Sequence, residues 1–114
     1  MTVVVPARNA ALTILQSLHS ILSQVGVTEV IVVDDEPGLR LMIEDYLGTQ
    51  DYVVRTAEGG VELDALLRER PADIIVLDVN MPGEDGISIA RRLRQAAERA
   101  GIVMLTAAGD EASR

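Results

Sequence analysis

The chain has 114 residues, and its 18 acidic and 10 basic side chains give a formal net charge of −8. This length fits a single domain, and a hydrophobic content of 48% is too high for a disordered chain. The absence of cysteine excludes a disulfide framework and thiol catalysis, and the acidic balance argues against a nucleic-acid partner.

Five short runs rich in β-branched residues alternate with four stretches of helical spacing. Such runs suit strands that are buried on both faces of a parallel sheet. In chain order we expect a strand at 2–5, a helix at 10–25, a strand at 30–33, a helix at 37–48, a strand at 52–56, a helix at 58–69, a strand at 73–77, a helix at 86–99 and a strand at 102–106. The alternation predicts a three-layer α/β sandwich with right-handed crossovers.

No apolar run is long enough to span a bilayer, and the first residues lack the pattern of a signal peptide. We therefore expect a cytoplasmic protein without a membrane partner.

Polar side chains follow three of the predicted strands. Asp34 and Asp35 end the second strand, Asp78 ends the fourth, and Thr106 ends the fifth. Ligands of open parallel sheets bind beyond the carboxyl ends of the strands, so three carboxylates converge if the second and fourth strands are neighbours. A hard divalent cation relieves the repulsion between such groups. One carboxylate could then accept a phosphoryl group, and the threonine hydroxyl could bind the new phosphate.

Each of these residues also has an ordinary structural interpretation. An acid at a strand end often caps the next helix, and threonine is common in strands. The coincidence of the three positions favours a site over these interpretations. The arginines at 91, 92 and 94 are expected to form a solvated helix face.

Residues 29–114 resemble the receiver domain of two-component response regulators of the transcription-factor type. The resemblance is carried by VVDDEP at 32–37, DIIVLD at 73–78, MPGEDG at 81–86 and MLTA at 104–107. It implies a flavodoxin-like fold, with Asp78 as phosphoacceptor and a histidine kinase as phosphodonor. It also implies that Asp35 and Asp78 bind Mg²⁺, that Asp34 helps through water and that the Asn80 carbonyl is a further ligand. Thr106 would be the switch hydroxyl, and no enzyme activity is expected.

A receiver continues through a further helix, a strand that bears a lysine and a last helix, whereas this sequence ends at Arg114 and contains no lysine. Residues 2–35 resemble instead the opening of a family-2 glycosyltransferase, on VVVPARN at 3–9 and EVIVVDD at 29–35. That resemblance implies a nucleotide-sugar site near Pro6, Arg8 and Asp35. Because both families share a strand of the type VIVVDD, we predict a chimera: a single domain over 1–114 made of units 1–28 and 29–114.

The N-terminal strand is expected to take the place of the missing last receiver strand, beside residues 102–106, and helix 10–25 that of the last helix. The alternative is strand exchange between two chains, since an open sheet edge can also serve as a homodimer contact. Three functions follow: a phosphoacceptor receiver module with Mg²⁺, a chimeric or designed α/β scaffold without activity, and a nucleotide-sugar-binding fragment. We expect the first.

Overall fold

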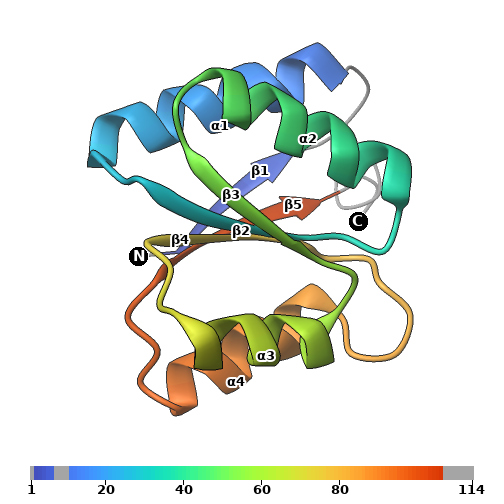
Figure 1. The fold of residues 1–114 in the computed structure, drawn as a ribbon. Helices are drawn as coiled ribbons and strands as arrows, with labels where there is room; N and C mark the ends of the chain where they lie inside the picture. The colour runs from blue at the N-terminus through green and yellow to red at the C-terminus, as the bar shows by residue number, and fades with distance from the viewer. Residues whose placement is uncertain (1, 7–10, 107–114) are drawn as a thin grey trace.

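The computed structural model describes residues 2–6 and 11–106. The elements in chain order are β1 (Thr2–Pro6), α1 (Ala11–Val25), β2 (Glu29–Val33), α2 (Pro37–Thr49), β3 (Val53–Ala57), α3 (Gly60–Glu69), β4 (Ile74–Asp78), α4 (Gly86–Gln95) and β5 (Gly101–Thr106). The strands form one parallel sheet in the order β1-β5-β4-β2-β3. Figure 1 shows α1 and α2 on one face of this sheet and α3 and α4 on the other. The predicted three-layer sandwich is confirmed.

The N-terminal strand lies beside the last strand, as expected. β1 pairs with β5 of the same chain, in a register that runs from Thr2 opposite Ile102 to Pro6 opposite Thr106. Helix α1 lies next to α2 on the same face of the sheet (Figure 1). Residues 7–10, with Arg8 among them, and residues 107–114 lie outside the described residues.

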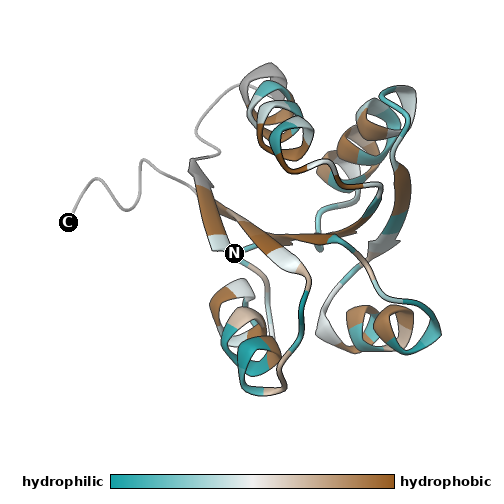
Figure 2. Cartoon of the chain, turned by 90° about the vertical axis from the view of Figure 1, so that its left-hand side faces the viewer, coloured by the Kyte–Doolittle hydropathy of each residue, from teal (hydrophilic) through white to brown (hydrophobic). Residues whose placement is uncertain are grey.

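The apolar runs of the central strands are buried because helices cover both faces of the sheet. In β2, Val30 and Val32 belong to the core beneath α1 and α2, while Ile31 and Val33 belong to the core against α3 and α4. Figure 2 shows this hydrophobic sheet running between the two helix layers. The buried sheet therefore supports the polar residues at its carboxyl edge, which are Asp34, Asp35, Asp78 and Thr106.

Helix α4 ends at Gln95, four residues earlier than predicted. Ala97 has a positive φ of 61°, which breaks the helical path. The guanidinium of Arg94 donates to the carbonyl oxygens of Glu98 and Ala100 at 2.8 and 3.0 Å, and the Glu98 carboxylate accepts the Ala100 N–H. These bonds close a turn that residue propensity alone does not reveal. The other element boundaries differ from the predicted ones by at most two residues.

Candidate functional site

Three carboxylates meet at the carboxyl edge of the sheet. Asp34 and Asp35 follow β2, Asp78 is the last residue of β4, and these two strands are neighbours. Each residue offers an oxygen, and the three oxygens lie within 4.8 Å of one another. Asp34 is buried, Asp78 is half-buried and Asp35 is exposed, so the cluster opens to solvent on one side.

Backbone and side-chain hydrogen bonds fix Asp34 in this cluster. Its N–H donates to the Ala57 carbonyl of β3 at 3.1 Å, and its own carbonyl accepts from the Arg40 guanidinium at 2.7 Å. Its Oδ1 accepts the Glu36 N–H at 2.9 Å. The second oxygen, Oδ2, is buried and has no hydrogen-bond partner within the described part of the chain. An unpartnered buried oxygen of this kind is a position that a cation can occupy.

Burial dominates the electrostatics of the cluster. It raises the pKa of Asp34 to about 7, the Glu36 N–H acts in the opposite direction, and the negative charge of Asp78 raises the pKa further. Burial also raises the pKa of Asp78, against the lowering effect of the hydrogen bond from the Asn80 N–H. Without a cation, the pair therefore retains a proton at a pH at which isolated aspartates are ionised.

Asn80 stands at the start of the loop between β4 and α4. Its N–H donates to Asp78 Oδ1 at 3.0 Å, and this bond fixes the rotation of the carboxylate. The base of the loop is closed by a hydrogen bond from the Gly86 N–H to the Val79 carbonyl at 3.1 Å. A Cβ at residue 86 would lie 2.4 Å from the Asp78 carbonyl oxygen, so only glycine fits there. Gly86 belongs to the MPGEDG stretch at 81–86, but this close approach was not predicted from the sequence.

Thr106 ends β5 at the same edge of the sheet. Asp78 pairs with Leu105 across the two strands, which places Thr106 one residue farther along in the same direction. Its side chain is half-buried.

Two of the three arginines that were expected to form a solvated face on α4 are only partly exposed and form specific hydrogen bonds. Arg92 donates to both oxygens of Glu84, at 2.7 and 3.0 Å, and to Asp64 at 3.0 Å. Arg94 holds the turn after the helix. Arg40, which binds the Asp34 carbonyl, was also missed because nothing in its sequence surroundings marks it.

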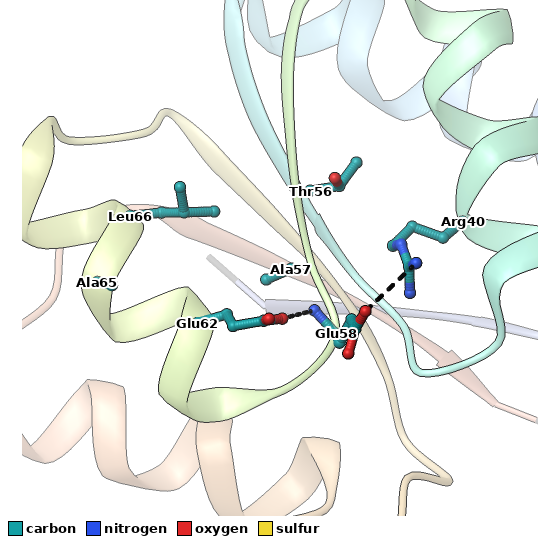
Figure 3. Close-up of a pocket in the computed structure, with 7 residues that line it drawn as sticks. All are labelled: Arg40, Thr56, Ala57, Glu58, Glu62, Ala65 and Leu66. Carbon is teal, nitrogen blue, oxygen red and sulfur yellow. Dashed lines mark hydrogen bonds and ion pairs between the residues drawn. The ribbon is translucent and has the colours of Figure 1, made fainter.

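A separate hollow of about 370 Å³ lies beside β3, and Figure 3 shows its lining. Arg40 borders it from α2 and forms an ion pair with Glu58 at 3.9 Å, while Glu62 and Leu66 border it from α3. None of the three clustered carboxylates lines it, so this hollow is distinct from the acidic cluster.

The donor set of the cluster suits a hard cation. It consists of carboxylate oxygens, and the chain has no cysteine to favour a softer metal. Mg²⁺ binds through a few carboxylates and keeps several waters, which fits a cluster that is open to solvent on one side. The buried Oδ2 of Asp34 agrees with this fit.

Residues 30–114 match the family described as Response regulator receiver domain. The chain belongs to this family. This receiver domain is 41% identical over 93 residues to the transcriptional regulatory protein ResD of Bacillus subtilis. The matched region covers 82% of this chain and 38% of ResD. It is 40% identical over 88 residues to the phosphate regulon transcriptional regulatory protein PhoB of Rhizobium meliloti. Here the matched region covers 75% of this chain and 39% of PhoB. The chain thus spans about two fifths of the length of these relatives.

Solved receiver structures share the fold. The response regulator TrrA of Thermotoga maritima, in complex with Mg²⁺-BeF, has a TM-score of 0.65 and 35% identity, with 70% of each chain covered. TrrA in complex with the histidine kinase ThkA has a TM-score of 0.64 and 35% identity, covering 70% of this chain and 69% of TrrA. The flavodoxin-like fold expected from the sequence is confirmed. Among the described residues, no helix has the length and apolar character needed to cross a membrane.

Proposed function

We propose that this receiver domain accepts a phosphoryl group on Asp78, with Mg²⁺ held by Asp34, Asp35, Asp78 and the carbonyl of Asn80. The observation that carries the proposal is the meeting of three carboxylate oxygens within 4.8 Å, in a chain of the receiver family. The Mg²⁺ reported with TrrA supports the choice of metal.

The residues of the chain have distinct parts in this reaction. An oxygen of Asp78 forms a bond to phosphorus while the P–N bond of a phosphohistidine donor breaks, and the departing imidazole takes a proton from solvent. The Asn80 N–H holds the accepting carboxylate in one rotation. Bound Mg²⁺ supplies positive charge that neutralises the oxygens of the group in transit. The Thr106 hydroxyl is proposed to bind the phosphate after transfer.

A histidine kinase is the proposed phosphodonor, and the complex of TrrA with ThkA supports this class of partner. The chain is the acceptor in this scheme and is not proposed to turn over a substrate, whether a kinase or a small donor supplies the group. A cytoplasmic location belongs to the same proposal and is supported by the role of ResD and PhoB as transcriptional regulators.

Phosphorylation with a small donor tests the proposal. The chain is incubated with acetyl phosphate and Mg²⁺, and its intact mass is measured. We expect one added phosphoryl group that hydroxylamine removes, and none in Asp78→Asn. The matched control is Asp45→Asn, an exposed acid on α2, which should be labelled like the wild type. Equal labelling of Asp78→Asn refutes the assignment, and a wild type that takes up no phosphoryl group and does not respond to Mg²⁺ favours the inactive scaffold.

We also propose that the single domain over 1–114 consists of units 1–28 and 29–114. The family match from residue 30 onward and the position of β1 beside the last strand support this division. The glycosyltransferase resemblance of residues 2–35 remains a prediction from the sequence.

A homodimer would form through β1. This strand is at the edge of the sheet, contains no charged residue and leaves Val4 54% exposed, whereas protected edges usually carry charge. Sedimentation velocity over a range of concentrations tests this contact. Val4→Lys should abolish any dimer, and a dimer that persists in this variant excludes the edge.

A further inference from the structure

An ion-pair network connects the loop after β4 with two helices. Glu84 lies in this loop, and both its carboxylate oxygens accept from Arg92 of α4, at 2.7 and 3.0 Å. A further nitrogen of Arg92 donates to Asp64 of α3 at 3.0 Å. A guanidinium that binds a carboxylate through two parallel bonds fixes its direction as well as its distance. Glu84 is therefore held in one orientation between α3 and α4.

The first residue of α3 makes room for this carboxylate. A Cβ at Gly60 would lie 2.4 Å from Glu84 Oε1 and 3.2 Å from Arg92 Nη2. A Cβ at the adjacent Gly59 would meet nothing within 4 Å. Gly60 has no left-handed φ, so a larger residue there would act mainly by displacing the Glu84 carboxylate. We call Gly60, Asp64, Glu84 and Arg92 the loop clasp.

The loop clasp holds the end of the β4–α4 loop that is farther along the chain from Asp78. Asn80 stands at the start of the loop and bonds to Asp78, while Glu84 stands four residues later. Gly83 has a φ of +78° and turns the chain just before Glu84. The path of residues 80–84 is thus fixed at one end by Asp78 and at the other by the clasp.

We propose that the loop clasp positions the β4–α4 loop so that Asn80 keeps its place beside Asp78, and that it thereby sets the affinity of the acidic cluster for Mg²⁺. The part that concerns Mg²⁺ rests on the proposed function. Glu84 and Arg92 are positioning residues, since they act on the site through the loop. Their side chains are 36% and 39% exposed, and exposed ion pairs add little to global stability. We therefore expect loss of the clasp to change the position of the loop and to leave the free energy of unfolding nearly unchanged.

Two neighbouring glycine variants separate the clasp from general effects on α3. Gly60→Ala displaces the Glu84 carboxylate, whereas Gly59→Ala meets open space. We expect Gly60→Ala to raise the dissociation constant for Mg²⁺, measured by isothermal titration calorimetry, about tenfold, the lower end of what the loss of a supporting group costs a metal site. Gly59→Ala should bind Mg²⁺ like the wild type.

A double-mutant cycle tests whether the steric conflict with Glu84 is the cause. Glu84→Ala alone should weaken Mg²⁺ binding to a similar extent as Gly60→Ala. In the Glu84→Ala background, Gly60→Ala should have little further effect, because the carboxylate is gone and the next atom, Arg92 Nη2, lies 3.2 Å from the added Cβ. Additive losses in the double variant would contradict the proposal.

Amide hydrogen exchange of the metal-free chain gives a readout that does not depend on Mg²⁺. Exchange at the Asn80 N–H should accelerate in Gly60→Ala and Glu84→Ala, while the amides of β2 and β4 keep their wild-type rates. Acceleration in the strands as well would indicate a destabilised fold and overturn the positioning role, as would unchanged exchange at Asn80. If the wild type does not bind Mg²⁺, the proposed function fails, and the exchange data still decide whether the clasp holds the loop.

Discussion

Asp34 is a buried carboxyl group, and burial disfavours its charged form. Its carboxyl group has an ordinary pKa of 3.8 and a pKa of about 7 in the folded chain, because burial disfavours the charged form. Between these two pH values the folded state holds a proton that the unfolded state has released. The free energy of unfolding of the metal-free protein therefore falls as the pH rises through this window.

Asp34→Asn should remove this pH dependence. In EDTA, the unfolding free energy of the wild type, measured by urea denaturation, should fall from pH 3.8 to about pH 7, and the curve of the variant should be flatter. Near pH 8 the variant should be more stable than the metal-free wild type by about 1 to 3 kcal/mol. The exposed Asp45→Asn should follow the wild type. Parallel curves for wild type and Asp34→Asn would show that Asp34 does not hold the proton.

Gly86 permits the close approach between α4 and the end of β4. Gly86→Ala places a Cβ 2.4 Å from the Asp78 carbonyl oxygen, and this backbone atom cannot move without disturbing the strand. We expect a loss of about 1 to 3 kcal/mol in the free energy of unfolding and weaker Mg²⁺ binding. The control is Gly48→Ala in α2, where the added Cβ meets nothing within 4 Å and helix propensity should increase stability. Equal stability of the two variants would contradict the close contact.

At the scale of elements, α1 is part of the core and not an appendage. Leu18 is fully buried and shares one hydrophobic cluster with Ile43 and Leu47 of α2 and with strand residues. Leu18→Ala should therefore lower the free energy of unfolding by about 2 to 5 kcal/mol, as in other well-packed cores. The exposed Gln16→Ala on the same helix should have little effect. A single unfolding transition by circular dichroism would show that α1 unfolds with the sheet, and an unchanged midpoint for Leu18→Ala would contradict its place in the core.

The elements that sequence reasoning predicted best are those with a strong local pattern. The β-branched runs predicted each strand of the part of the chain that the structure describes, and the rule that ligands lie at the carboxyl edge predicted the meeting of the three aspartates. The end of α4 was missed because Arg94 and Glu98 close a turn through side-chain bonds that propensity does not include. The role of Arg92 was missed because its partners Asp64 and Glu84 lie 28 and 8 residues away in the chain.

At the scale of the whole molecule, β1 and α1 complete the sheet and the core that the later residues form. Deletion of residues 1–28 would turn β5 into an edge strand and remove four buried side chains of the core, Ile14, Leu15, Leu18 and Leu22. Exposed apolar edges of this kind favour association. We expect residues 29–114 alone to lose cooperative thermal unfolding and to scatter light as aggregates, whereas the full chain melts in one step. A monomeric 29–114 with a sharp transition would show that residues 1–28 are dispensable for folding.

The pairing of β1 with β5 also bears on how the chain reaches its native state during synthesis. Among the described residues β1 is the first strand and its partner β5 is the last, so β1 can join the sheet only after residues 101–106 have left the ribosome. Until then its apolar residues have no place in the sheet, and such unpaired segments of nascent chains are prone to misassembly. Completion of this sheet during synthesis is therefore timed by the emergence of residues 101–106 from the ribosomal tunnel.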